Sequence, residues 1–105
     1  QLENLTLYLD DHCIQDIPLE QIVRISCMSA RKLQTAFKEY HGCTITEYIQ
    51  QRRMSQAETL LAKTDLSIGQ VAQSVGYTSA SRFAELFRKS TGLLPLEYRK
   101  VSQRK

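Results

Sequence analysis

One polar helix face in this sequence carries side chains suited to hydrogen bonding with nucleic-acid bases. Four residues recur at spacings that place them together on one side of a helix: Arg31, Gln34, Thr35 and Lys38. A guanidinium can donate twice to guanine O6 and N7, and a glutamine amide can pair with adenine N6 and N7. Thr35 suits a thymine methyl or a phosphate. Lys38 and Lys32 suit phosphates, which position a protein without reading sequence.

A second polar face lies fifty residues further on and is less uniform. Ser81 and Arg82 stand near the start of a helix, where each can reach a base or a phosphate, and Arg88 suits a phosphate. Glu85 can accept from cytosine N4, or it can be repelled by phosphate and face away. We therefore predict that the first face discriminates sequence more strongly. The second face anchors through backbone groups at the helix start, Arg82 and Arg88.

The two faces belong to a repeated pattern. An apolar set recurs forty-nine residues later in the first part of the repeat and fifty residues later in the second, so one extra residue sits near Thr78. In the second part, Leu33, Phe37, Gly42 and Tyr48 recur as Phe83, Phe87, Gly92 and Tyr98. Each copy has a short amphipathic helix, a tight turn and a longer amphipathic helix, which is the pattern of a helix-turn-helix.

The elements that must position these faces are all helical. The apolar periodicity and the breakers predict an all-α chain of seven helices, near residues 3–13, 19–25, 29–40, 44–63, 68–75 and 79–90, with a short last helix from Pro95. Ser29 and Ser79 open the two polar helices, where their hydroxyls can cap the helix and meet a phosphate. Capping boxes are expected at residues 44–47 and 67–70. The inward stripe of residues 29–40 is expected to include Leu33, Ala36, Phe37 and Tyr40.

The predicted domain organisation is a first helix-turn-helix subdomain over residues 1–43, a linker helix over 44–63 and a second subdomain over 64–105. A helix of about twenty residues spans about 30 Å, close to one DNA turn of about 34 Å. The linker is therefore expected to act as a spacer. Of its adjacent arginines, Arg53 is interpreted as structural and Arg52 as a phosphate contact.

Charge and cysteine content limit the class of protein. The formal net charge is +3, with a −4 excess over residues 1–28 and a +7 excess over residues 29–105. A chain with a basic main part and an acidic end can orient itself on a polyanion. An ordinary solvated surface could carry the same net charges. Cys13, Cys27 and Cys43 match no usual zinc spacing and are expected to be buried or half-buried thiols in a reducing cytoplasm. No stretch has membrane-spanning length.

The chain resembles the AraC/XylS family of bacterial transcription regulators over residues 5–99. The resemblance is carried by Ile68, Val71, Ala72, Gly76, Tyr77, Ser79, Ser81, Phe83, Phe87, Arg88, Gly92, Pro95, Tyr98 and Arg99, and by Tyr48, Ile49, Arg53, Met54, Ala57, Leu60 and Leu61 in the linker. It implies two helix-turn-helix subdomains that enter successive major grooves of double-stranded DNA. It also implies RNA polymerase as a partner, an activator role and an N-terminal effector or dimerisation domain outside this chain, which opens without Met.

The chain departs from the family pattern at several positions. Cys27 stands where the first turn commonly has glycine, Thr35 where arginine is common, and Glu85 where arginine or lysine is common. These departures bear on base reading rather than on the fold.

Other functions are weighed against this prediction. No catalytic set, glycine-rich phosphate loop, metal site or cofactor is expected, so the segment is not predicted to be an enzyme. The first alternative is a helical protein-interaction module whose basic faces meet an acidic partner. The second is an RNA binder, which would prefer single-stranded loops or hairpins. Salt dependence of duplex binding separates the leading function from the first alternative.

Overall fold

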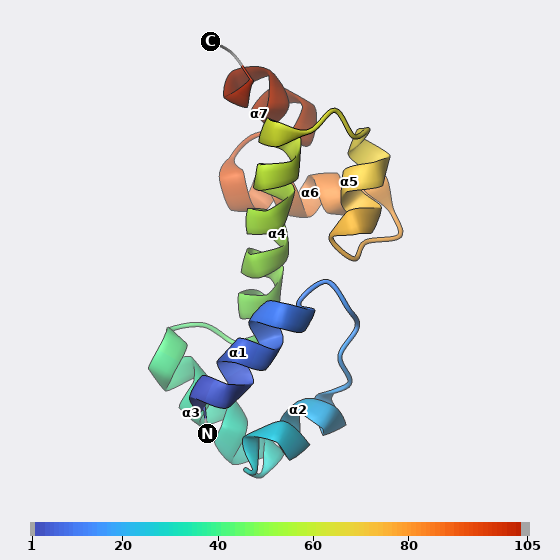
Figure 1. Cartoon of the computed structure of the whole chain (residues 1–105). Coiled ribbons are helices and arrows are strands. Elements are labelled where there is room, and N and C mark those ends of the chain that lie inside the picture. The colour runs from blue at the N-terminus through green and yellow to red at the C-terminus, as the bar shows by residue number, and fades with distance from the viewer. Residues whose placement is uncertain (1, 104–105) are drawn as a thin grey trace. The chain divides into compact units, whose positions relative to one another are not determined.

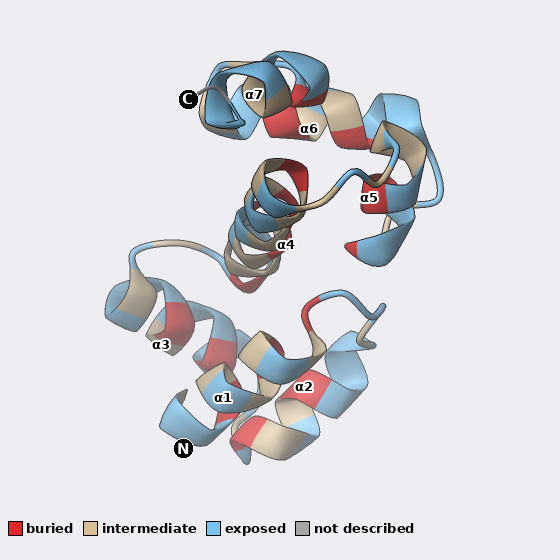
Figure 2. Cartoon of the chain, turned by 45° about the horizontal axis from the view of Figure 1, so that its top comes forward, coloured by how far each residue is buried: buried red, intermediate tan, exposed pale blue. Residues whose placement is uncertain are grey.

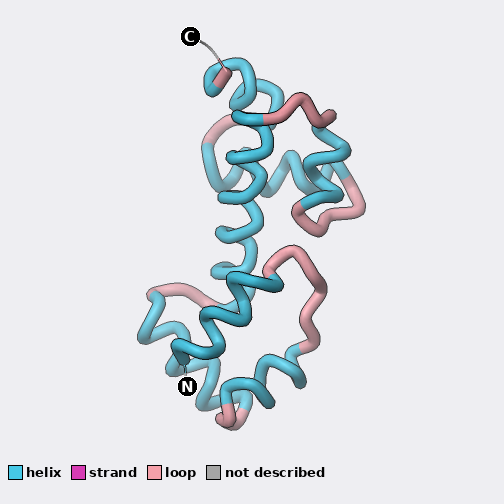
Figure 3. Tube along the Cα trace, in the orientation of Figure 1, coloured by secondary structure: helices cyan, strands magenta, loops and turns pink. Residues whose placement is uncertain are grey.

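The described part of the chain is built from helices alone. The computed structural model describes residues 2–103, and Gln1 and the basic tail residues Arg104 and Lys105 lie outside this range. Seven helices and no strand occur within it (Figures 1 and 3), as the sequence predicts. They are α1 (Leu2–His12), α2 (Leu19–Ser26), α3 (Ala30–His41), α4 (Ile45–Lys63), α5 (Ile68–Ser74), α6 (Ala80–Thr91) and α7 (Pro95–Ser102).

The chain divides into two compact units, residues 1–52 and residues 53–105. We call these the first unit and the second unit. The division falls inside α4, so the beginning of this helix belongs to the first unit and its remainder to the second. The predicted role of residues 44–63 as a spacer stays a prediction.

The core of the first unit is formed by α1, α2, α3 and the start of α4. Its buried side chains are Leu5, Leu9, Ile22, Leu33, Phe37 and Ile45. Leu5 and Leu9 lie one helical turn apart, so α1 presents a narrow apolar stripe to the other helices. The prediction that Tyr40 points inward is wrong, because this side chain in the last turn of α3 is 61% exposed.

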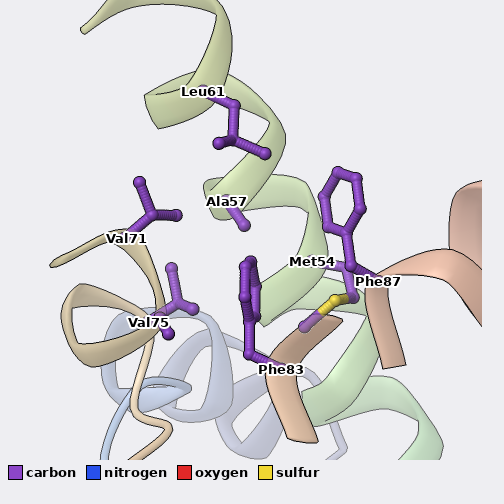
Figure 4. Close-up of a cluster of buried hydrophobic side chains, with 8 residues drawn as sticks. Met54, Ala57, Leu61, Val71, Val75, Phe83 and Phe87 are labelled. Carbon is purple, nitrogen blue, oxygen red and sulfur yellow. The ribbon is translucent and has the colours of Figure 1, made fainter. Parts of the chain in front are cut away.

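The core of the second unit uses the later part of α4 where the first unit uses α1. Met54, Ala57 and Leu61 project from α4 toward Val71 and Val75 of the α5 segment and toward Phe83 and Phe87 of α6 (Figure 4). Each of these side chains is at most 3% exposed. A single long helix therefore supplies both the capped start that completes one core and the apolar stripe that completes the other.

The repeat in the sequence is confirmed at the helix ends. Helices α6 and α7 begin fifty residues after α3 and α4, and α6 ends fifty residues after α3. Gly42 and Gly92 both end their helices in the left-handed conformation, with φ of 78° and 86°. The Glu47 carboxylate accepts from the Thr44 N–H, and the Glu97 carboxylate accepts from the Leu94 N–H, each over 2.9 Å. Local capping chemistry therefore sets the same helix ends in both units. The glycines end α3 and α6, and the glutamates cap the starts of α4 and α7.

The turn between the two helices of each pair differs between the units. Cys27 follows α2 with φ 60° and ψ 26°, a left-handed conformation that costs a residue with a side chain about 1–2 kcal/mol. At the matching place in the second unit the residue is Gly76, with φ 95°. Cys27 is exposed, which contradicts the prediction that all three cysteines would be buried or half-buried. The Cys27 thiol lies 3.9 Å from the carbonyl oxygens of Arg24 and Ile25, at the end of α2.

Candidate nucleic-acid interface

The polar face of α3 is held outward by the residues beneath it. Leu33 and Phe37 are fully buried, so side chains on the opposite side of this short helix must face solvent. Five of the predicted contact residues are exposed on α3: Arg31, Lys32, Gln34, Thr35 and Lys38. The structure therefore brings together the whole first set that the spacing predicts.

The start of α3 is fixed by the serine that precedes it. The Ser29 hydroxyl accepts a hydrogen bond from the Lys32 backbone N–H over 3.3 Å. The Thr35 hydroxyl donates to the Arg31 carbonyl over 3.2 Å. With its hydroxyl turned to its own helix, Thr35 has its methyl group left for an apolar contact, which favours a thymine methyl over a phosphate as its partner.

The polar face of α6 repeats this construction in the second unit. The Ser79 hydroxyl accepts from the Arg82 N–H over 3.2 Å, and Phe83 and Phe87 are fully buried. The ribbon of α6 carries both buried and exposed stretches (Figure 2). The predicted contact residues Ser81, Arg82, Glu85 and Arg88 are exposed. Ala84, on the same helix, is half-buried.

The charges on the two polar helices are similar in number but differently placed. On α3 the cations are Arg31, Lys32 and Lys38, with Glu39 in the last half of the helix. On α6 the cations are Arg82, Arg88 and Lys89, with Glu85 between them. Within residues 2–103, the Glu85 carboxylate has no ion pair, although Arg82 and Lys89 lie at suitable helical spacings. The second helix thus presents an unneutralised carboxylate in the middle of its face.

One exposed cation was missed in the sequence analysis. Lys89 follows Arg88 on α6 and is exposed, while the matching residue of the first unit is the acid Glu39. Lys89 follows Arg82 by seven residues and Glu85 by four, so helical periodicity places it on the same side of α6 as these two residues. It adds positive charge next to Arg88.

Arg52 pairs with an acidic residue of α1 within the first unit. Its guanidinium Nε lies 3.2 Å from Asp10 Oδ1, and the same oxygen accepts a hydrogen bond of 2.6 Å from the Tyr48 hydroxyl. Burial and this bond to Asp10 raise the pKa of Tyr48 to about 12. Arg52 therefore joins α1 to the start of α4. Its side chain is still 42% exposed, so the interpretation of Arg52 as a phosphate contact stays a prediction.

Arg53 has the structural role that the sequence indicates. It is 8% exposed, and its guanidinium carbon lies 5.0 Å from the centre of the Tyr77 ring. A cation over an aromatic face at this distance is attracted by the ring. Arg53 thereby ties α4 to the turn that precedes α6 within the second unit.

Comparison with known proteins decides the family. The helix-turn-helix domain family matches residues 22–101. The xylose operon regulatory protein of Escherichia coli (strain K12) is 34% identical over 95 residues, which are 90% of this chain and 24% of that protein. This chain belongs to the AraC/XylS family. It is a helix-turn-helix domain of the kind that DNA-binding transcription regulators carry.

Two further AraC/XylS-type matches bear on function. AdaA of Bacillus subtilis (strain 168), named a bifunctional transcriptional activator and DNA repair enzyme, is 35% identical over 99 residues, covering 94% of this chain and 47% of AdaA. The DNA-binding domain of AdpA, solved in complex with a target DNA, matches with a TM-score of 0.88 and 25% identity over 95% of this chain and 90% of that chain. The chain therefore spans about half or less of the length of these curated relatives.

Two other features, a membrane-spanning helix and a metal centre, are absent from residues 2–103. No helix there is long and apolar enough to cross a membrane. In the same range, no group of three or more His, Cys, Asp or Glu side chains is placed to hold a metal ion.

Proposed function

We propose that this chain is the duplex-reading part of a bacterial transcription activator, and that α3 and α6 enter successive major grooves. The observation that carries the proposal is that each unit presents one capped helix with an exposed polar face over buried apolar side chains, Leu33 and Phe37 in α3 and Phe83 and Phe87 in α6. Two relatives support the assignment, since AdaA is named an activator and AdpA binds a target DNA. Helix α4 has 19 residues, which correspond to a rise of about 28 Å.

The proposed base contacts lie in the first half of each polar helix. Arg31, Gln34 and Thr35 read bases from α3, and Ser81, Arg82 and Glu85 lie at the corresponding part of α6. Arg31 offers the paired donors that guanine requires, and Gln34 offers the donor and acceptor that adenine requires. A good two-bond contact of this kind discriminates against the wrong base by about 1–3 kcal/mol.

The proposed phosphate contacts surround these base contacts. Ser29 and Lys32 lie at the start of α3, and Lys38 lies near its end. Ser79 and Arg88 hold the matching places on α6. A hydroxyl that accepts from its own helix can still donate its proton to a phosphate oxygen. These contacts set position and orientation without reading sequence.

We further propose that the first unit supplies most of the discrimination between sequences. Its face contains two side chains with paired hydrogen-bonding geometry, Arg31 and Gln34. The face of α6 contains one such donor, Arg82, next to the repelling carboxylate of Glu85. The second unit therefore contributes mainly anchoring.

The remaining assignments concern the whole protein. We propose a regulator that contacts RNA polymerase, carries an N-terminal effector or dimerisation domain and acts in the cytoplasm, where thiols such as those of Cys13, Cys27 and Cys43 stay reduced. We propose no enzymatic activity for this segment, because it belongs to a family of DNA-binding regulatory domains. The repair activity named for AdaA is not carried over.

The experiment that tests the proposal is the salt dependence of binding to duplex DNA. Contacts to several phosphates make the logarithm of affinity fall linearly with the logarithm of salt, with a slope of about −0.9 for each phosphate neutralised. We expect a slope of about −4 or steeper on random duplex. A slope near zero would favour the protein-interaction module. Preference for single-stranded hairpins over duplex would favour the RNA binder.

A further inference from the structure

An ion pair in the first unit holds one arginine of α4 against α1. Arg52 Nε lies 3.2 Å from Asp10 Oδ1, and this nitrogen is itself shielded from solvent. The Arg52 side chain as a whole is nevertheless 42% exposed, and that of Asp10 is 32% exposed. The pair therefore places a guanidinium and a carboxylate, with no net charge between them, where a charged partner can reach both.

The carboxylate of this pair is also fixed by Tyr48. The Tyr48 hydroxyl donates to the same oxygen, Asp10 Oδ1, over 2.6 Å. The Tyr48 ring packs against Phe37, with 5.6 Å between the ring centres, and its pKa of about 12 keeps the hydroxyl protonated at neutral pH. Asp10 therefore has a fixed position on α1 and cannot follow the Arg52 side chain if that side chain turns toward another anion.

Arg52 lies on the side of α4 that borders the polar face of α3. Thr35 and Lys38 of α3 line a groove, and Ile45 and Ile49 of α4 line the same groove. Arg52 follows Ile45 by seven residues and Ile49 by three, so it shares their side of the helix. An arginine on this side lies next to the proposed DNA-contacting face, where a phosphate of a bound duplex can meet it.

The second unit has no such pair at the matching position. Fifty residues after Arg52 the chain has Ser102, whose hydroxyl donates to the Tyr98 carbonyl of its own helix over 2.7 Å. A serine has no charge to neutralise. Any effect of the pair on binding is therefore confined to the first unit.

We propose that Asp10 is an internal counter-ion that holds Arg52 back from a DNA phosphate and thereby limits the affinity of the first unit for duplex DNA. The carboxylate cancels the charge of Arg52 and itself repels phosphates. Released from Asp10, Arg52 makes the phosphate contact that the sequence predicts. This inference rests on the proposed function, because it concerns the duplex that α3 contacts.

The inference is tested with the unmodified chain and Asp10→Asn, by fluorescence anisotropy of a labelled random duplex at several salt concentrations. Asparagine keeps the shape of the side chain, and its carbonyl can still accept from Tyr48, so only the charge is removed. We expect Asp10→Asn to bind about two- to fivefold more tightly, the range for an exposed ion pair. The salt slope should steepen by about 0.9, which corresponds to one additional phosphate contact.

Asp11→Asn is the matched control, because it removes the neighbouring exposed carboxylate of α1 and leaves the pair intact. It should raise affinity less than Asp10→Asn and leave the salt slope unchanged. In an Arg52→Gln chain, Asp10→Asn should raise affinity no more than Asp11→Asn does in the unmodified chain. An equal gain with and without Arg52 would overturn the inference. Weaker binding or an unchanged slope in Asp10→Asn, the result expected of a merely structural residue, would also overturn it.

A second measurement needs no substitution and so does not depend on the folding of Asp10→Asn. The Arg52 Nε–H is shielded from solvent, so its NMR resonance can be followed while duplex is added to the unmodified chain. This resonance should keep its position while backbone resonances of α3 shift. A large shift of the Arg52 resonance would show that Asp10 does not retain the arginine, and would overturn the inference alone. A chain that binds no duplex at any salt concentration would overturn the proposed function as well.

Discussion

The first and second units have the same helical framework, but they differ at many positions where a side chain meets solvent. The serine caps, the glycine ends and the buried phenylalanines coincide at an offset of fifty residues. Phe37 packs edge-on against Tyr48, with 5.6 Å between the ring centres, and Phe87 packs edge-on against Tyr98, with 5.4 Å between the ring centres. The two units therefore share residues where backbone geometry or core packing restricts the choice of side chain. Exposed residues without such a role are free to differ.

Three differences between the units have physical consequences. The left-handed turn residue is Cys27 in one unit and Gly76 in the other. The outer helix position is Thr35 in one and Glu85 in the other. The Tyr48 hydroxyl bonds to Asp10, whereas the matching Tyr98 hydroxyl has no hydrogen-bond partner within residues 2–103. Each difference can be altered by one substitution.

The largest expected effect tests the shared framework. Phe37→Ala and Phe87→Ala each remove a fully buried ring and its edge-on partner contact. Each should destabilise the chain by about 3–5 kcal/mol, because truncation loses burial and leaves a cavity. Urea unfolding followed by circular dichroism measures this. A much smaller loss from one of the two would show that the cores are not equivalent.

The next effect concerns the exposed helix positions. Thr35→Glu should weaken duplex binding by about tenfold, because it places a carboxylate in the polar face near phosphates. The opposite change, Glu85→Thr, should strengthen binding to random duplex by about two- to fivefold. Fluorescence anisotropy at fixed salt measures both. If Glu85→Thr leaves affinity unchanged on every sequence, Glu85 faces away from DNA and the placement of α6 needs revision.

A smaller effect is expected at the turns. Gly76→Ala should destabilise the chain by about 1–2 kcal/mol, because alanine resists the left-handed conformation. Cys27→Gly should stabilise it by up to about 1 kcal/mol, since it relieves the same strain at some cost in chain entropy. Thermal unfolding of both variants measures the difference. Destabilisation by Cys27→Gly would contradict the strained turn.

The smallest effect concerns the two tyrosines. Tyr48→Phe should cost about 1 kcal/mol, the usual net contribution of one hydrogen bond, and Tyr98→Phe should be close to neutral. Because folding raises the pKa of Tyr48 from 10.0 to about 12, the stabilisation is complete below pH 10 and is lost as pH rises toward 12. The free energy of unfolding, measured with urea at several pH values in this range, should show this pH dependence in the unmodified chain and in Tyr98→Phe. Tyr48→Phe should lack it.

Most of the helix ends could be predicted from the sequence because capping is local. The Ser67 and Gln70 capping box appears with hydrogen bonds of 2.9 and 3.1 Å, where the spacing places it. Gly42 ends α3 because a glycine readily adopts the left-handed conformation that closes a helix, and this depends only on neighbouring residues. The exposed set on α3 also follows from local periodicity, since Leu33 and Phe37 determine which side faces inward.

The features that could not be predicted depend on contacts between distant segments. Helical spacing shows the direction of Tyr40 but not whether another helix covers it. Asp10 and Arg52 lie far apart in sequence, so their pairing requires the fold of α1 against α4. A groove beside Lys38 is lined by residues of α2, α3 and the start of α4, so the period of no single helix predicts it.

The most direct test of the account is selection of binding sites from random duplexes by the unmodified chain, Arg31→Ala and Arg82→Ala. The unmodified chain should return two short boxes about one helical turn apart, about 10–10.5 base pairs centre to centre. Arg31→Ala should erase sequence preference in one box, whereas Arg82→Ala should lower affinity nearly equally on all sequences. A single box, or equal loss of preference from both variants, would contradict two reading helices of unequal discrimination.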